Sequence, residues 1–347
     1  MKALVYKSTG QVALEDKARP GLIASTDAVV KMLKTTICGT DLHILKGDVK
    51  EVVFGLTLGH EGIGIVEETG DAVTNFKKGD HVLISCITSC GKCEYCRKGM
   101  YSHCQDGGWI LGHLIDGTQA EYVRIPYADT SLYHIPAGTN EESLVMLSDI
   151  LPTAYECGVL NGQVQPGSAV AIVGAGPIGL AALSTAQFFS PATIVMIDND
   201  NNRPEVAKKM GATHVINSSE ENVIEKVMAL TDFEGVDTAM EAVGIPATFE
   251  LCTRLIRPGG KVANIGVHGK SVSLALDELW SKNITITTRL VDTYTTPMLL
   301  KTVSSKKLDP ASFITHRFAL SDIENAYRTF GNAAKEKALK VIISNDY

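Results

Sequence analysis

The stretch that decides the fold is Val170-Ala-Ile-Val-Gly-Ala-Gly-Pro-Ile-Gly-Leu180. The apolar run over 169–173 predicts a strand buried on both faces. A helix is expected from Pro177, because the missing N–H of proline costs nothing at a first helical position. The N-terminus of such a helix presents unpaired N–H groups to phosphate. The stretch therefore predicts a strand, a tight turn and a helix that together bind a dinucleotide.

The glycines of this turn follow the spacing G-x-G-x-x-G, and each has a physical role. Gly174 lets the chain turn away from the strand, Gly176 lets the backbone approach a pyrophosphate, and Gly179 lets the helix lie close to the sheet. Pro177 and Ile178 complete the predicted cofactor-binding segment. The glycine spacing alone is weak evidence for a dinucleotide-binding fold, so the residues that follow it have to support that interpretation.

A second apolar run, Thr193-Ile-Val-Met-Ile-Asp198, predicts the next strand and ends in an acid 19 residues after Gly179. A carboxylate at this place accepts hydrogen bonds from the adenosine ribose, and it repels the 2′-phosphate of NADP. Asp198 therefore predicts NAD as the cofactor. Arg203 also belongs to this cofactor-binding region and could meet a 2′-phosphate, but we interpret it as a surface residue at a helix start.

The segment from Cys157 to Ile197 contains no Asp, Glu, Lys, Arg or His. A membrane-spanning helix needs about 20 apolar residues, so such a helix is an alternative interpretation. Glycines, three prolines and several Gln and Ser residues divide the segment into short apolar runs. Short runs are typical of strands buried on both faces of a sheet, and we favour that interpretation.

Composition limits the class of protein. The chain has 347 residues, of which 45% are hydrophobic and 20% charged, as in globular proteins with enough chain for two cores. A formal net charge of −7 without a basic run argues against nucleic acid as the main partner. The start, Met1-Lys-Ala-Leu-Val-Tyr-Lys7, has no apolar signal region, so we expect a cytoplasmic protein with no membrane partner. In that compartment the eight cysteines indicate metal binding or catalysis before disulfides.

Two domains are expected from the change in pattern along the chain. Up to residue 148, short extended runs separated by turn signals such as Lys78-Gly-Asp80 predict an irregular, partly open β-barrel. Beyond Asp198, strands and helices alternate, which predicts a doubly wound parallel sheet with helices on both faces. The predicted domains are residues 1–149 with 287–347, and residues 150–286.

Cys90-Gly-Lys-Cys93-Glu-Tyr-Cys96, followed by Cys104 after seven residues, predicts a metal site. Four thiolates can close a tetrahedral site around Zn²⁺ that has no open position, so the role would be structural. An iron–sulfur cluster is an alternative, although in ferredoxins the fourth cysteine comes sooner and precedes proline, whereas Gln105 follows here. Free thiols or disulfides are a further alternative.

Three other residues can carry chemistry but are ambiguous one at a time. Cys38 by itself would be a small core residue. His60 would be a buried, hydrogen-bonded imidazole. Asp149, which precedes a helical segment, would be an N-cap.

Taken together, these residues resemble the zinc-containing medium-chain alcohol dehydrogenase family, nearest its bacterial secondary alcohol dehydrogenase branch. The resemblance covers nearly the whole chain. It rests on Cys38-Gly-Thr-Asp-Leu-His43, Gly59-His-Glu-Gly-Ile-Gly64, the cysteine cluster, Gly174 to Gly179 and Asp198. It implies an α/β fold, in which a GroES-like irregular β-barrel catalytic domain holds the zinc sites and a Rossmann domain binds NAD.

The resemblance also implies the ligands of a catalytic Zn²⁺. Cys38, His60 and Asp149 match the ligand positions, and Glu61 matches a neighbouring carboxylate that can approach the metal. An aspartate at 149 resembles the secondary alcohol and threonine dehydrogenases, because the liver-type enzymes have a cysteine there. Cys157 is an alternative ligand, but it falls inside the following helix.

Further roles follow from the same resemblance. Thr40 matches the hydroxyl that touches the alcohol oxygen, and His43 matches a residue on the proton path to solvent. Trp109 resembles a tryptophan of the substrate-pocket wall, with plain core packing as the alternative. Cys86 lies near the same wall by analogy and is otherwise an ordinary strand residue. Several other histidines are interpreted as surface or packing residues, namely His113, His134, His268 and His316.

The expected function is that of an NAD-dependent zinc alcohol dehydrogenase, acting reversibly on small and preferably secondary alcohols. One alternative is a relative of the same family that acts on a polyol, a vicinal diol such as butanediol, or threonine. Others are a non-catalytic NAD-binding relative and a ferredoxin-like electron carrier. Bacterial relatives imply a homo-tetramer, and the alternating run Ile284–Thr288 predicts an edge strand through which two copies could pair.

Overall fold

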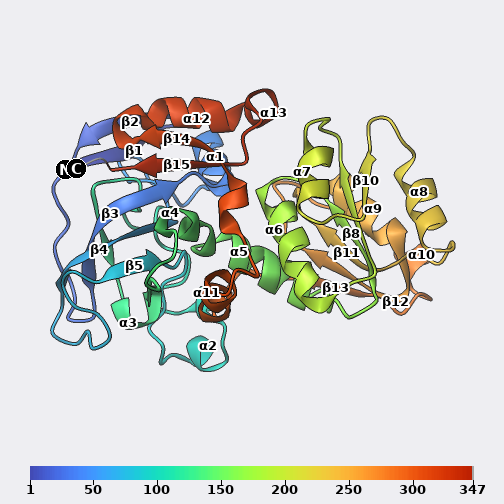
Figure 1. Cartoon of the computed structure of the whole chain (residues 1–347). Coiled ribbons are helices and arrows are strands. Elements are labelled where there is room, and N and C mark those ends of the chain that lie inside the picture. The colour runs from blue at the N-terminus through green and yellow to red at the C-terminus, as the bar shows by residue number, and fades with distance from the viewer. Residues whose placement is uncertain (346–347) are drawn as a thin grey trace. The chain divides into compact units, whose positions relative to one another are not determined.

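The computed structural model describes residues 1–345. The chain forms two compact units (Figure 1). Unit 1 comprises Met1–Pro152 and the chain from Asp292 onward, and unit 2 comprises Thr153–Val291. The boundaries predicted after residues 149 and 286 lie a few residues before these. The chain from Asp292 belongs to the unit that contains the N-terminus.

Unit 2 is built on a parallel sheet of six strands within the described residues, in the order β10-β9-β8-β11-β12-β13. This confirms the predicted doubly wound fold. Its strands are β8 Ala169–Val173, β9 Thr193–Asp198, β10 His214–Asn217, β11 Val236–Glu241, β12 Ile256–Asn264 and β13 Thr285–Thr288. Its helices are η3 Ala154–Leu160, α6 Pro177–Ala186, η4 Gln187–Phe189, α7 Arg203–Lys209, α8 Val223–Leu230, α9 Pro246–Leu255 and α10 Leu276–Leu279.

The charge-free segment 157–197 is the centre of this unit. It contains the end of η3, all of β8 and α6, and most of β9, so it is divided among several elements. The side chains of β8 and β9 are buried on both faces of the sheet, as parallel strands require. Among the described residues, one helical run, Glu141–Leu160, is long and apolar enough to cross a membrane. Since 83% of that window is buried inside the fold, it has the character of a core helix.

Unit 1 is a mainly antiparallel β structure. Its larger sheet follows the order β14-β15-β3-β4-β5-β7 with β6 paired to β3, and β1 pairs with β2 apart from it. The strands are β1 Lys2–Ser8, β2 Gln11–Asp16, β3 Ala28–Thr36, β4 Gly62–Thr69, β5 His81–Ile84, β6 Tyr122–Ile125, β7 Leu132–His134, β14 Ile314–Ala319 and β15 Lys340–Ser344.

Short helices connect these strands. They are α1 Gly39–Lys46, α2 Glu94–Arg97, η1 Tyr101–His103, α3 Ala128–Ser131, α4 Glu141–Leu144, η2 Val145–Leu147, α5 Ile150–Thr153, α11 Thr296–Ser304, η5 Pro310–Phe313, η6 Leu320–Asp322, α12 Ile323–Gly331 and α13 Ala333–Glu336. The helical segment expected after Asp149 is divided, because α5 is followed by the π-helical segment η3.

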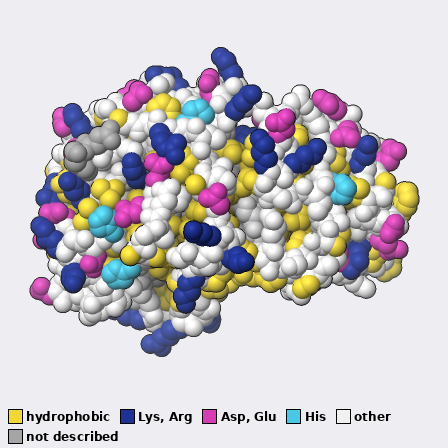
Figure 2. Space-filling view, in the orientation of Figure 1, with side chains coloured by type: hydrophobic (Ala, Val, Ile, Leu, Met, Phe, Trp, Pro, Cys, Tyr) yellow, Lys and Arg dark blue, Asp and Glu magenta, His cyan; other side chains and the backbone are white. Residues whose placement is uncertain are grey.

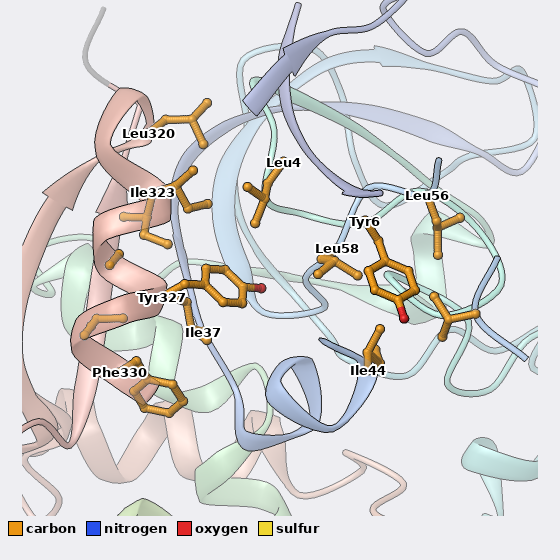
Figure 3. Packing of buried hydrophobic residues seen from close by; sticks show 14 residues of the cluster. Leu4, Tyr6, Ile37, Ile44, Leu56, Leu58, Leu320, Ile323, Tyr327 and Phe330 are labelled. Atoms are coloured by element: carbon orange, nitrogen blue, oxygen red, sulfur yellow. The ribbon is translucent and has the colours of Figure 1, made fainter. Parts of the chain in front are cut away.

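One core cluster explains why the C-terminal part of the chain returns to unit 1. Figure 3 shows Tyr327 and Phe330 of α12 facing side chains from the N-terminal segments, among them Leu4 and Ile37. These side chains are almost completely buried. Burial of a large apolar side chain stabilises the fold by about 1.5–3 kcal/mol, so the cluster holds both ends of the chain against α1.

Charged side chains of both signs are interspersed over the face shown in Figure 2. That face carries no extended patch of Lys and Arg of the kind that binds nucleic acid.

Candidate active site and metal centres

The four cysteines predicted to bind metal form one cluster in unit 1, called here the closed cluster: Cys90, Cys93, Cys96 and Cys104. Their sulfur atoms all lie within 4.8 Å of one another. Cys93 and Cys96 are 3.5 Å apart through their Sγ atoms, and Cys90 and Cys96 are 4.0 Å apart. The short helix α2 turns the chain so that the first three sulfurs face the same point. All eight cysteines are free thiols, which argues against the disulfide alternative.

Backbone amides favour thiolate in the closed cluster. N–H groups of Cys96 and Gln105 lower the pKa of Cys93 to about 6. Burial and the hydrogen bond with Cys93 raise the pKa of Cys96 to about 12. Four sulfurs so close together fit Zn²⁺, which binds thiolates; four protein ligands would leave it no open position.

A second group of metal-capable side chains, the open cluster, consists of Cys38, His60, Glu61 and Asp149. One donor atom from each lies within 4.8 Å of the others. The Asp149 Oδ2 atom is 3.1 Å from His60 Nε2 and 3.6 Å from Cys38 Sγ. The structure thus brings together the three residues that are ambiguous one at a time.

Local structure explains how the open cluster is assembled. Cys38 follows β3 and is the N-cap of α1, whereas His60 and Glu61 immediately precede β4. β3 and β4 pair as antiparallel neighbours, which brings the two segments together. The Asp149 segment is fixed by its neighbour, because Ser148 Oγ accepts a hydrogen bond of 3.0 Å from the Gly62 amide.

The electrostatics of the open cluster indicate a site that needs a cation. Burial raises the pKa of the Cys38 thiol, and the charge of Asp149 raises it further. Burial likewise raises the pKa of Glu61, with Asp149 again adding to the shift. Thiolate, imidazole and carboxylate are all ligands of Zn²⁺. A metal ion held by Cys38, His60 and Asp149 would relieve this repulsion, so the residues present fit the group.

Lys340 is a residue of the site that sequence reasoning missed. Its Nζ atom donates a hydrogen bond of 2.7 Å to Glu61 Oε1, and both side chains are only 1% exposed. Nζ also donates to the carbonyl of Ile37 at 3.1 Å. Burial lowers the pKa of Lys340, but the charges of Glu61, Cys38 and Asp149 and the hydrogen bond to Glu61 together outweigh it, so the net shift is upward. The signal in the sequence was a lone lysine entering the apolar run Lys340-Val-Ile-Ile.

Asp41 is a second missed residue, although it lies inside a motif quoted above. Its Oδ2 atom accepts hydrogen bonds from the Cys38 amide at 2.9 Å and from Gln119 Nε2 at 3.1 Å. Its Oδ1 atom is 3.9 Å from His60 Nδ1. Tyr327 in turn donates to Gln119 Oε1 at 2.8 Å. Asp41 therefore fixes the backbone at Cys38, and its Oδ1 atom, which is buried and has no hydrogen-bond partner among the described residues, faces the His60 ring.

The two residues predicted to move a proton lie on α1. Thr40 Oγ1 is 3.7 Å from Cys38 Sγ, so the hydroxyl lies beside the open cluster. His43 is further along the helix, 38% exposed, with Nδ1 at 2.9 Å from Asp48 Oδ2. Thr40 is thus at the site and His43 reaches solvent.

The predicted pocket residues also lie near the open cluster. The Trp109 ring is 6.4 Å from the His60 ring at a steep angle and stacks on His113 at 4.1 Å. His113 is therefore a packing residue. Cys86 is buried, and its amide donates to the Ser148 carbonyl at 3.1 Å, next to Asp149. Cys157, the alternative ligand, lies in η3 of unit 2.

The glycine turn of unit 2 has the geometry that its spacing predicts. Gly174 has a φ of +105°, a conformation that favours glycine, and a Cβ there would be 2.7 Å from Val243. A Cβ on Gly179 would overlap the Gly174 carbonyl oxygen. A Cβ on Gly176 would meet nothing within 4 Å, so this amide borders open space at the N-terminus of α6. The turn offers a cradle for a phosphate group.

Asp198 lies at the end of β9 beside this turn. Its Oδ2 atom accepts from the Ala175 amide at 2.5 Å, and its Oδ1 atom accepts from the Asp200 amide at 2.8 Å. The expectation that Arg203 is a surface residue is wrong, because its side chain is only 11% exposed. Its Nε atom is 3.5 Å from Asp200 Oδ2, one turn earlier, and this ion pair draws it inward.

Comparisons with known proteins agree with this geometry. Residues 24–137 match the family model of the alcohol dehydrogenase GroES-like domain, and residues 177–305 match the zinc-binding dehydrogenase model. An alcohol dehydrogenase of Cupriavidus necator is 37% identical, over 99% of this chain and 98% of its own. A probable NADP-dependent isopropanol dehydrogenase of Mycoplasma pneumoniae is 31% identical, over 99% of this chain and 100% of its own.

Solved structures give the same result. The apo form of zinc-dependent alcohol dehydrogenase 2 from Streptococcus pneumonia is 56% identical, covers 100% of this chain and 99% of its own, and has a TM-score of 0.96. The alcohol dehydrogenase TADH from Thermus sp. ATN1 is 34% identical over 99% of both chains, with a TM-score of 0.92. This chain therefore belongs to the zinc-dependent alcohol dehydrogenases, with a GroES-like domain joined to a Rossmann domain.

Proposed function

We propose that this alcohol dehydrogenase interconverts small secondary alcohols and ketones, with NAD as its preferred cofactor. The observation that carries the proposal is the meeting of Cys38, His60 and Asp149 in one buried cluster. Three protein ligands leave one coordination position for a substrate oxygen, as catalytic zinc sites require. The closed cluster has four ligands, and its proposed role is structural.

The residues of the open cluster have distinct proposed roles. When bound, Zn²⁺ makes an alcohol a stronger acid, and the nicotinamide ring exchanges hydride with the substrate carbon. Cys38, His60 and Asp149 would hold the metal, and Asp41 positions Cys38 through its backbone amide. Thr40 takes the alcohol proton at Oγ1.

The proton path continues along α1. A hydroxyl can accept one hydrogen bond while donating another, so Thr40 can pass a proton onward without a change in its own charge. His43 is exposed to solvent on the same helix and is its proposed exit.

Asp198 supports NAD as the preferred cofactor. It places a carboxylate at the end of β9, where a 2′-phosphate would be repelled. Arg203 is engaged with Asp200, so its charge is already compensated. Two relatives are named as NADP-dependent isopropanol dehydrogenases, so the preference of this protein for NAD has to be measured directly.

Asp198→Gly should weaken NAD binding and raise the use of NADP relative to NAD by about tenfold or more, since a hydrogen bond to a charged group contributes about 1.5–3 kcal/mol.

The preference for small secondary alcohols is supported by two relatives named isopropanol dehydrogenase and by the bulky Trp109 ring beside His60. A sorbitol dehydrogenase of Bacillus subtilis, 30% identical over 99% of this chain, supports polyols as the second possibility. The experiment is a panel of primary, secondary, vicinal and polyhydric alcohols with NAD and NADP. Highest kcat/KM for a small secondary alcohol with NAD is the expected result. A preference for sorbitol-like substrates, or for NADP in the unmodified protein, would contradict the proposal.

Assembly and location stay predictions. β13 is at one end of the unit 2 sheet, and Trp280, 78% exposed, lies just before it in the chain. An open parallel-sheet edge with an exposed aromatic nearby supports pairing of two copies, and a homo-tetramer made of two such pairs is proposed. A monomeric mass by light scattering would contradict this.

The proposed location is the cytoplasm, where free cysteines persist.

A further inference from the structure

The ion pair between Lys340 and Glu61 lies at the edge of the open cluster. The pair is completely buried, and its Nζ–Oε1 distance is 2.7 Å. Desolvation of two opposite charges costs several kcal/mol per ion, so a buried pair is weak evidence of a purely stabilising role. The position of this pair therefore calls for an explanation in terms of the site.

The two oxygens of Glu61 have different surroundings. Oε1 accepts the hydrogen bond from Lys340. Oε2 is buried and, among the described residues, has no hydrogen-bond partner. One oxygen of this carboxylate lies within 4.8 Å of the donor atoms of Cys38, His60 and Asp149. A buried carboxylate with one unpartnered oxygen, so close to the predicted metal site, could itself bind the metal.

Lys340 is anchored independently of Glu61. Its Nζ atom donates a second hydrogen bond to the Ile37 carbonyl, immediately before Cys38. Its backbone belongs to β15, which pairs with β3. The Glu61 backbone is also fixed, because its carbonyl accepts hydrogen bonds from Thr35 at 2.7 Å and Thr118 at 2.9 Å. With its backbone held in this way, Glu61 would move between the ammonium and a bound metal by rotation of its side chain.

We propose that Lys340 is a positioning residue whose ammonium holds Glu61 off the catalytic metal and so keeps the fourth coordination position open for substrate. The proposal rests on the proposed function, since it needs a metal at Cys38, His60 and Asp149. Without the ammonium, Glu61 is a buried carboxylate whose nearest compensating charge is the metal. Glu61 then becomes a fourth protein ligand, and the open site acquires the character of the closed cluster.

The test uses the full-length protein loaded with Co²⁺, whose visible absorption reports the coordination of the metal. The band of the open cluster is identified as the one that disappears in Cys38→Ala. In Lys340→Met this band should change position and intensity. Loss of the metal to a chelator should become slower by about tenfold, the low end of what partners of metal ligands contribute to affinity. A lysine with a merely structural role would give the opposite result, faster metal loss.

Three further variants make the result specific. Lys340→Arg keeps a cation and should keep the parental band. Lys340→Met combined with Glu61→Gln removes the competing charge and should restore the parental band and chelation rate. Lys34→Met is the matched control, because Lys34 donates to Ser344 on the same strand, β15, and its loss should leave the band unchanged. Lys340→Gln, which keeps a hydrogen-bond donor, replaces Lys340→Met if that protein does not fold, with the same expected result.

A folded Lys340→Met or Lys340→Gln protein with the parental band and chelation rate would overturn the proposal. So would a changed band that persists in the double variant, because Glu61 would then not be the group that moves. A parental protein with no Cys38-dependent band would instead contradict the metal site itself and the proposed function with it. The two failures are therefore distinguishable.

Discussion

The closed cluster and the open cluster lie in the same unit, but the chain builds them in different ways. The outermost ligands of the closed cluster, Cys90 and Cys104, are 14 residues apart. Those of the open cluster, Cys38 and Asp149, are 111 residues apart. The closed cluster is formed by one short loop. The open cluster forms only when folding brings together β3, β4 and the segment that contains Ser148.

This difference matches the chemistry proposed for each site. A loop that supplies four thiolates encloses its metal, so nothing else can bind there. A site assembled from distant segments can supply three ligands and hold a fourth group, Glu61, back on Lys340. The comparison predicts that damage to the open cluster removes catalysis and leaves the fold, whereas damage to the closed cluster lowers stability and leaves the rate of the folded, metal-loaded protein nearly unchanged.

The largest effect is expected from Asp149→Ala. Loss of a ligand should empty the open cluster and lower kcat/KM by about 10³–10⁵-fold, because a catalytic metal contributes several kcal/mol and each 1.36 kcal/mol is a factor of ten. Metal analysis should find one zinc per chain in place of two. Asp149→Cys is the control, since a thiolate also binds zinc and should restore metal content. Full occupancy of both sites in Asp149→Ala would refute the ligand assignment.

The next effect separates proton transfer from metal binding within the open cluster. Thr40→Val keeps the shape of the side chain but removes the hydroxyl, and turnover per zinc-loaded site should fall by about 10²–10⁴-fold. Thr40→Ser keeps the hydroxyl and should keep most of the activity. Metal content and thermal unfolding, recorded alongside, should be unchanged. Near-normal turnover per loaded site in Thr40→Val would remove Thr40 from the mechanism.

A smaller effect on catalysis and a larger one on stability are expected from Cys93→Ala. Structural zinc contributes directly to folding, so the melting temperature should fall by about 10 °C or more, at about 2–4 °C per kcal/mol for a unit of this size. The rate per metal-loaded open cluster should stay within about threefold of the parental rate, since a substitution far from a reacting group changes the transition state little. An unchanged melting temperature would show that the closed cluster has no structural role.

The same comparison explains how far sequence reasoning reached. The glycine turn and the four cysteines could be predicted because their spacing along the chain already fixes their geometry. Asp149 was predicted as a metal ligand only through a family resemblance, since nothing local distinguishes it from an N-cap. Lys340 and Asp41 were missed because their roles depend on partners that strand pairing brings close.

Arg203 was placed on the surface for a related reason. A sequence gives the residue type, and arginine is usually exposed. Its partner Asp200 is only three residues earlier, just before α7, but a sequence does not show that the two side chains meet. Lys340 and Asp41, by contrast, have partners from distant parts of the chain.

The most direct test of the account is stepwise removal of metal from the unmodified protein, with zinc content, turnover and melting temperature measured on the same samples. The account predicts that activity disappears with the first zinc lost per chain, while the melting temperature falls mainly with the second. One equivalent of zinc should restore activity to the protein that has lost only one. If activity and melting temperature fell together in proportion to total zinc, the division of roles between the open and closed clusters would be contradicted.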